Sequence, residues 1–343
     1  MSTTGSEPRP DTPALETEQS ALLSRKINEL ALRIRGTHLE TLIAQLYREL
    51  DQAGITFKPE TYLADEWGCP DDVPVIGIPF YLADPALCRL EGQLTGIAAE
   101  SDAEVMMYLR HETGHALNYA YRLHTLPKWQ QMFGLMSQPY QEEYRPVPFS
   151  TRYVRHVPGW YGQKHPDEDF AETFAVWLTP GSNWRERYAD TPALAKLRYV
   201  DGLMRQYSQQ PPRVHTGALD TPVEEMDMSL AEWYATPGST YRDRCTLPTL
   251  LDQDLRTVFP DAEGEPAAEL VRAQRGQLIQ DLYGWTGVNR HLLGALCDEL
   301  LERVQALGLK VAPQQSTVRL VSLAILMTTL VMNYHYTEHF VNP

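Results

Sequence analysis

Cysteine is scarce in this chain of 343 residues, and Cys69, Cys88, Cys245 and Cys297 are scattered without a Cys-x-x-Cys spacing. This pattern excludes a zinc ribbon and a dense disulfide framework. Basic residues are also few, since 30 Lys and Arg stand against 45 Asp and Glu. The formal charge of −15 opposes general attraction to nucleic acid or to an anionic membrane. We therefore expect a cytoplasmic protein with reduced thiols that binds neither.

Long apolar runs are missing as well. Residues 1–18 have neither a basic start nor an apolar core, so they predict a flexible tail rather than a secretory signal. The most apolar stretch, residues 320–332, has about thirteen residues where a bilayer span needs about twenty, and it predicts a core helix. A hydrophobic content of 43% is typical of a globular chain with a sizeable core.

The motif HETGH at residues 111–115 carries the clearest chemical information. It lies in a predicted helix whose start is marked by Ser101 and, three residues later, Glu104, the pattern of a capping box. His111 and His115 are four residues apart, so on a helix they project from consecutive turns and can reach one cation. We expect one zinc ion, because zinc takes two imidazoles, a carboxylate and a water in a tetrahedral site. Coordination lowers the pKa of such a water from about 15.7 to about 7. Glu112 is placed to accept its proton as a general base.

A second predicted helix, residues 166–178, carries Glu168 and Glu172 four apart on one face. Glu168 is the expected third zinc ligand. Glu172 is placed to accept the remaining N–H of a ligand histidine and to fix its tautomer. The alternative is that both glutamates lie on a solvated surface, as most helical glutamates do.

The combination of His111-Glu112-x-x-His115 with Glu168-x-x-x-Glu172 resembles the gluzincin metallopeptidases. The segment HPDEDFAETFAVWL, residues 165–178, is similar in sequence to a bacterial group of zinc-binding metallopeptidases. The resemblance covers residues 60 to 190 and implies a zincin-like domain that cleaves peptide bonds. In lethal-factor-like gluzincins a tyrosine seven residues before the third ligand polarises the scissile carbonyl. Tyr161 holds that position here, which implies that it stabilises the oxyanion.

The loop-rich residues 125–165 separate the two predicted helices, and connections this long are usually functional when ordered. We interpret residues 148–161 as a wall of the substrate cleft. Within them Arg152 or Arg155 offers a fork for a substrate carboxylate, and Tyr153 and His156 are alternatives to Tyr161 as oxyanion donors. Structural pairing of each arginine at the surface is the competing interpretation.

Periodicity predicts an α-rich α+β fold. Residues 19–53 read as long amphipathic helices divided near Gly36, which pack on a core or, alternatively, dimerise. Residues 73–82 are rich in β-formers and contain two prolines, so we expect an edge strand or irregular pairing. Such an edge strand could hold a substrate peptide, and a short structural strand without substrate contact is the equal alternative. The predicted division is a zincin-like catalytic domain with a small sheet over residues 19–240 and a C-terminal helical bundle domain over residues 241–343.

The helices expected in that second domain cover residues 250–258, 266–283, 288–307 and 316–339. His335 and His339 on the last of them are four apart, but they lack an intervening Glu and a third ligand, so a structural role is favoured. The function predicted for the whole chain is an intracellular zinc metallopeptidase acting on a peptide or peptide-like substrate. Hydrolysis of a non-peptide amide in metabolite tailoring, or a regulatory protein with a structural zinc, are the alternatives.

Overall fold

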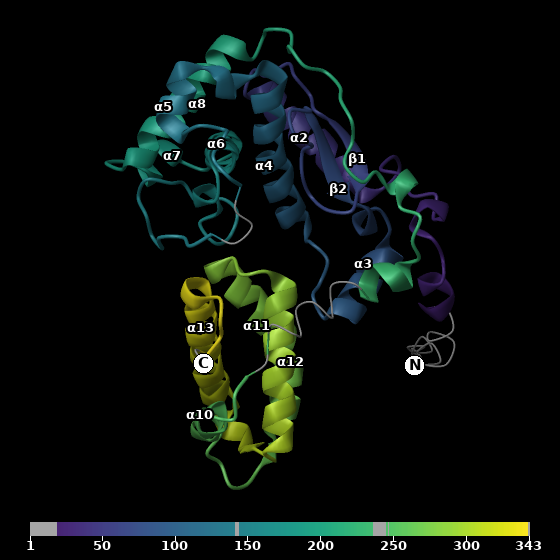
Figure 1. The fold of residues 1–343 in the computed structure, drawn as a ribbon, viewed down its shortest axis with the longest axis vertical. Coiled ribbons are helices and arrows are strands. Elements are labelled where there is room, and N and C mark those ends of the chain that lie inside the picture. Colours follow the sequence, from purple (N-terminus) through teal and green to yellow (C-terminus); the bar gives the residue numbers. More distant parts are fainter. Residues whose placement is uncertain (1–18, 141–143, 236–244, 246, 342–343) are drawn as a thin grey trace, which may run out of the picture.

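The computed structural model describes residues 19–140, 144–235, 245 and 247–341, and the predicted tail over 1–18 lies outside them. The protein is helix-rich with a small sheet, which confirms that much of the predicted fold class. In Figure 1 a first part contains helices α2 to α8 and the sheet of β1 and β2, and α10 to α13 form a second group. The helices of the first part are α2 (His38–Gln52), α3 (Pro85–Thr95), α4 (Asp102–Tyr121), α5 (Pro127–Phe133), α6 (Pro166–Leu178), α7 (Trp184–Arg187) and α8 (Pro192–Tyr207).

Helices α4 and α6 begin where the sequence predicts. At the start of α4 the Ser101 side chain accepts from the Glu104 amide and the Glu104 carboxylate accepts from the Ser101 amide, which is the predicted capping box. Pro166 occupies the first turn of α6, where its missing N–H costs nothing. The two helices pack closely, because a Cβ added to Gly114 would lie 2.7 Å from the Cα of Ala171. Glycine at position 114 therefore permits this close approach.

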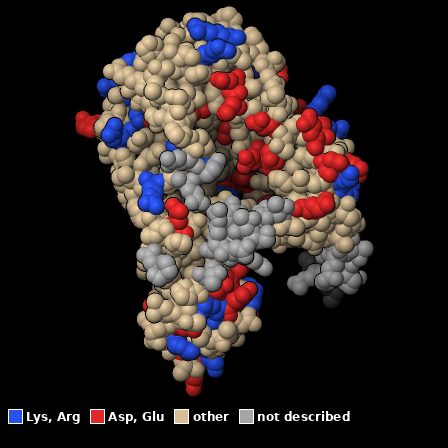
Figure 2. All heavy atoms as spheres, in the orientation of Figure 1, with Lys and Arg blue, Asp and Glu red and all other residues tan. Residues whose placement is uncertain are grey.

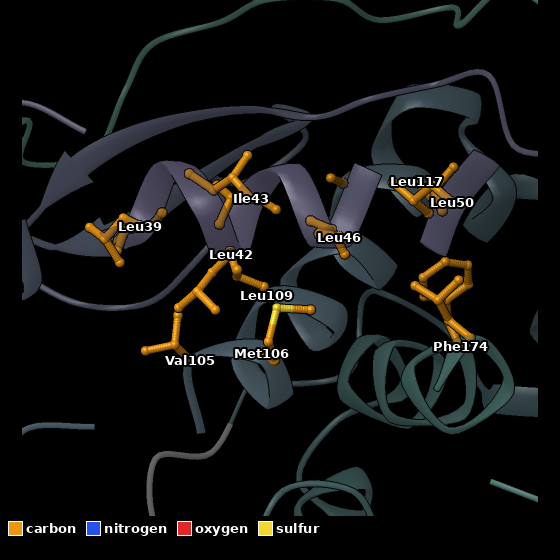
Figure 3. Close-up of a cluster of buried hydrophobic side chains, with 14 of the residues drawn as sticks. Leu39, Leu42, Ile43, Leu46, Leu50, Val105, Met106, Leu109, Leu117 and Phe174 are labelled. Carbon is orange, nitrogen blue, oxygen red and sulfur yellow. The ribbon is translucent and has the colours of Figure 1, made fainter. Parts of the chain in front are cut away.

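Helix α2 packs on the apolar face of α4. Its apolar stripe is fully or nearly fully buried, and Figure 3 shows it pointing at the apolar face of α4 and at Phe174 of α6. The side chains labelled there are Leu39, Leu42, Ile43, Leu46, Leu50, Val105, Met106, Leu109, Leu117 and Phe174. This core holds the backbone of α4 in place by apolar packing.

The predicted long helix before Gly36 is wrong. Residues 19–23 are helical, but the chain then forms only the short 3-10 turn η1 (Ile27–Glu29) and an irregular segment up to α2. Ala31 has a φ of 53°, which a continuous helix does not allow. The reason is tertiary: the amides of Ile27 and Asn28 donate to the carbonyls of Met228 and Met226, so this segment pairs with a distant one.

The first sheet has two parallel strands, β1 (Glu60–Ala64) and β2 (Val75–Pro79), with Tyr62 opposite Gly77. All five residues of β2 are buried, and its other side is occupied by a bridge between Gly77 and Gly68. The expected edge strand for a peptide is therefore shorter than predicted and covered on both sides. Short 3-10 turns complete this part: η2 (Phe80–Ala83), η3 (Leu123–Thr125), η4 (Tyr161–Gln163) and η5 (Val223–Glu225).

The second group contains α10 (Leu251–Val258), α11 (Ala267–Thr286), α12 (Arg290–Ala306) and α13 (Ser316–Thr337), close to the predicted ranges. Strands β3 (Glu265–Pro266) and β4 (Lys310–Val311) pair antiparallel, and η6 (Pro313–Gln315) precedes α13. Their buried side chains form one hydrophobic cluster that is separate from the core around α4. Ile97, from the segment before α4, belongs to this second cluster.

Helix α13 buries one face and exposes the other. Leu323, Met327 and Leu330 are buried, whereas Val321 and Ile325 are 54% and 62% exposed. Among the described residues, Pro313–Thr337 is the one helical stretch long and apolar enough to cross a membrane, a property that core helices of globular proteins share. This is weak evidence for a membrane span.

Polar contacts join the second group to the helix that carries the histidines. The hydroxyls of Tyr108 and Tyr283 are 2.6 Å apart, and Arg290 pairs with Glu104 of the α4 capping box. Backbone also meets backbone, since a Cβ added to Gly159 would lie 2.6 Å from the Cα of Gly287. The second group is therefore held against the N-terminal end of α4 and against the loop before α6.

Candidate metal centre

Three side chains predicted as zinc ligands converge at the α4–α6 contact. The Nε2 atoms of His111 and His115 are 3.1 Å apart, and they lie 3.0 Å and 3.2 Å from Oε2 of Glu168. All three residues are buried, and together they form a group able to hold a metal ion. Bonds of about 2.0–2.1 Å from each atom to one ion are compatible with this small triangle.

The second nitrogen of each histidine has its own carboxylate. Nδ1 of His111 lies 3.0 Å from Glu172, as predicted, and Nδ1 of His115 lies 2.8 Å from Asp167. Because a carboxylate accepts, both Nδ1 atoms carry the proton in the neutral tautomer, and both Nε2 atoms present lone pairs. Two lone pairs and a carboxylate oxygen then face one another within about 3 Å, which requires a cation or protons between them. The donor set therefore fits a metal ion.

Electrostatics favour a positive charge at this point. Burial alone would lower the pKa of His111, but hydrogen bonds to Glu168 and Glu172 raise it to about 10. The pKa of His115 is also raised, against burial, by Asp167 and Glu168. A divalent cation supplies that positive charge while leaving both Nε2 atoms unprotonated.

Glu112 lies beside the ligands on the same helix and lines the same cavity. Its side chain is 6% exposed, and burial raises the pKa of its carboxyl above 4.5. A carboxylate with a raised pKa is a better proton acceptor near neutrality. Its backbone carbonyl accepts from the Cys69 thiol, which ties the segment before β2 to α4.

Tyr161 starts η4 and packs its ring edge-on against His111, with centroids 5.6 Å apart. Burial and the nearby Glu168 charge raise the pKa of this phenol well above 10, so it stays protonated and can donate. Tyr140 is a second phenol at the site that sequence analysis missed, and its hydroxyl donates to Oε1 of Glu168 over 2.7 Å. Tyr140 lies 28 residues before Glu168 in irregular chain, where no spacing marks it.

Four residues of the 148–161 segment that we proposed as substrate contacts are not brought to the cavity. Arg155 stacks on Trp160, Arg152 is exposed, and neither belongs to the cavity lining. Tyr153 lies under the ammonium group of Lys196. His156 is a support instead, because its amide donates to Glu172 and its ring to the Met107 carbonyl. Arg155 therefore faces aromatic rings and Arg152 is exposed, so neither arginine lines the cavity where we expected a carboxylate fork.

Asp167 is the supporting residue that the sequence interpretation overlooked. From the sequence it is only one of three acids in the first turn of α6, where an acid suits the positive end of the helix dipole. In the structure it is 5% exposed and accepts from His115, Tyr119 and Asn118. Only the packing of α4 on α6 distinguishes it from Asp169, which turns away and pairs with Lys196.

His335 and His339 do not form a metal site in the described part of the chain. His335 contacts the carbonyl of Thr286 through Nε2, and His339 is exposed. The structural interpretation of this pair therefore agrees with the contacts observed.

Comparison with known proteins finds no matching family model, no matching curated protein and no matching solved structure.

Proposed function

We propose that this protein is a zinc-dependent hydrolase, and that it is an intracellular metallopeptidase of the gluzincin type. The observation that carries the proposal is the convergence of His111, His115 and Glu168 at the wall of a cavity that Glu112 also lines. A structural zinc usually has four protein ligands, whereas this group offers three among the described residues and opens to a cavity. In this proposal residues 19–240 are a zincin-like catalytic domain and residues 241–343 a helical bundle domain.

A bound zinc ion supplies a Lewis acid and a water ligand whose pKa is lowered to about 7. Glu112 would act as general base toward the attacking water and then as proton donor to the leaving amine. Tyr161 donates a hydrogen bond to the scissile carbonyl oxygen as negative charge develops on it. Glu172 and Asp167 hold His111 and His115 in the tautomer that ligation needs.

The test combines metal analysis with hydrolysis of a peptide library. We expect about one zinc per chain in the purified protein and in the Glu112→Gln variant, because Glu112 is not a ligand. We also expect turnover by that variant to fall by at least about 10²–10⁴-fold. A His111→Ala/His115→Ala variant should lose the zinc. A protein without zinc, or a Glu112→Gln variant as active as the parent, would contradict the proposal.

A further inference from the structure

The metal centre opens into a single large cavity between the two parts of the molecule. Its volume is about 1280 Å³, and its wall includes Trp67, Tyr108 and Tyr161 from the first part and Tyr283 and His291 from the second. Such a volume exceeds what a small metabolite fills and is sufficient for several residues of an extended peptide. The charges along this wall therefore determine which peptides can enter.

Carboxylates outnumber basic groups on the described lining. The acidic residues there are Asp65, Glu66, Asp71, Asp72, Glu91, Glu100, Glu112, Asp167, Glu168 and Asp298, while the Lys and Arg residues are Arg275 and Arg290 alone. Figure 2 shows acidic side chains gathered around the hollow on this face.

Both arginines on the wall are already engaged within the protein. Arg275 makes two hydrogen bonds to Asp298 and others to the carbonyls of Thr95 and Gly96. Arg290 pairs with Glu104 and lies 4.3 Å from the ring centroid of Tyr283. Neither is therefore placed to bind a substrate carboxylate, and the wall disfavours an anionic peptide.

The acidic residues differ in how they are used. Glu100 accepts from Tyr81, and Asp298 holds Arg275, so these carboxylates have partners. Asp71 and Asp72 are exposed. Nε2 of His124 lies 3.8 Å from Asp72, but among the described residues no Lys or Arg nitrogen lies within ion-pair distance of either acid. Between the acids of residues 65–72 lies Trp67, stacked on Tyr108 with centroids 5.3 Å apart. Carboxylates beside an aromatic ring suit the charged head and the apolar stem of Lys or Arg.

We infer that the cavity selects peptides carrying a Lys or Arg side chain, which lies against the acidic wall segment formed by residues 65–72. This inference rests on the proposed peptidase function. The exposed acids Asp71 and Asp72 attract the cationic group as it enters, and low-dielectric walls concentrate that attraction. A substrate with Glu at the same place meets only repulsion.

The experiment uses the full-length, zinc-loaded protein and fluorogenic peptides that differ at one residue, which is Lys, norleucine or Glu. Norleucine is a matched control because it keeps the length of lysine without its charge. We expect kcat/KM for the Lys peptide to exceed that for norleucine by about tenfold or more, with Glu lowest. The preference should shrink as salt rises, since screening weakens exposed charges.

Variants then locate the effect. Asp71→Asn/Asp72→Asn should lower the ratio of kcat/KM for Lys over norleucine by about threefold or more. Glu224→Gln/Glu225→Gln makes the same change in net charge at two exposed acids that do not line the cavity, and it should keep the parent ratio. Equal changes in both variants would assign the preference to overall charge and overturn the inference.

Two further outcomes are distinguishable. Hydrolysis that favours norleucine or Glu peptides would overturn the charge selectivity while leaving the proposed peptidase function standing. Failure of the zinc-loaded protein to hydrolyse any peptide would refute the proposed function, and the substrate inference with it.

Discussion

Replacing Asp167 by Asn should loosen zinc binding without removing a ligand. The Asp167 carboxylate accepts three hydrogen bonds, from Nδ1 of His115 at 2.8 Å and from Tyr119 and Asn118 at 2.6 Å each. An asparagine offers one acceptor oxygen and turns an NH₂ group toward one of these donors. His115 then loses its tautomeric support, its fixed orientation, or both.

The expected size follows from this geometry. Loss of a partner that orients a ligand histidine typically weakens metal affinity by about 10–100-fold, which is about 1.4–2.7 kcal/mol. We expect a loss near the upper end of this range, because Asp167 is buried and no water can replace its carboxylate easily. The dissociation constant for zinc, measured by competition with a chromophoric chelator, is the direct readout.

Asp169→Asn provides a matched control. Asp169 lies on the same helix, is 2% exposed and pairs with Lys196, but it contacts neither histidine. Both variants therefore lose a buried carboxylate of α6, and thermal unfolding of the zinc-free proteins reports the cost to the fold. Zinc affinity should fall only in Asp167→Asn. Parent-like affinity in that variant, or an equal loss in both, would refute the role assigned to Asp167.

Three further predictions concern packing, chemistry and pH. Gly114→Ala should destabilise the fold by about 1–3 kcal/mol in urea unfolding, because the new Cβ would lie 2.7 Å from the Cα of Ala171. Gly202→Ala on α8, where an added Cβ meets nothing within 4 Å, should not destabilise the fold. An equal loss of stability in both variants would contradict the packing argument. Tyr161→Phe should keep zinc and lose about 10²–10³ in kcat, whereas Tyr47→Phe, whose phenol bonds the Pro59 carbonyl, should turn over like the parent. Burial raises the pKa of Glu91 from 4.5 to about 7. The free energy of unfolding is therefore unaffected by this group below pH 4.5, where Glu91 is protonated in both states, and it falls as the pH rises through about 7. Glu91→Gln should therefore be more stable than the parent by about 1–3 kcal/mol above pH 8 and similar near pH 4; urea unfolding showing no pH-dependent difference would contradict this.

The sequence was sufficient to predict the start of two helices whose first turn is marked by a capping residue or a proline. The Ser101 capping box and Pro166 mark the starts of α4 and α6, because a helix's first turn needs partners for its own amides. The same rules failed before Gly36, where residues of helical periodicity form a turn instead. Hydrogen bonds from Ile27 and Asn28 to residues about 200 positions away outweighed local propensity there.

The sequence by itself determined which three side chains could share an ion, since His111 and His115 are one turn apart and Glu168 lies on a second helix with its own start signal. The tertiary structure decided what surrounds them. Whether an acid supports a histidine, like Asp167, or pairs elsewhere, like Asp169, depends on how α4 crosses α6. The charge of the cavity wall likewise depends on segments brought together over more than two hundred residues. Periodicity reports the direction of a side chain along its own element, but it carries no information about the neighbour that it meets.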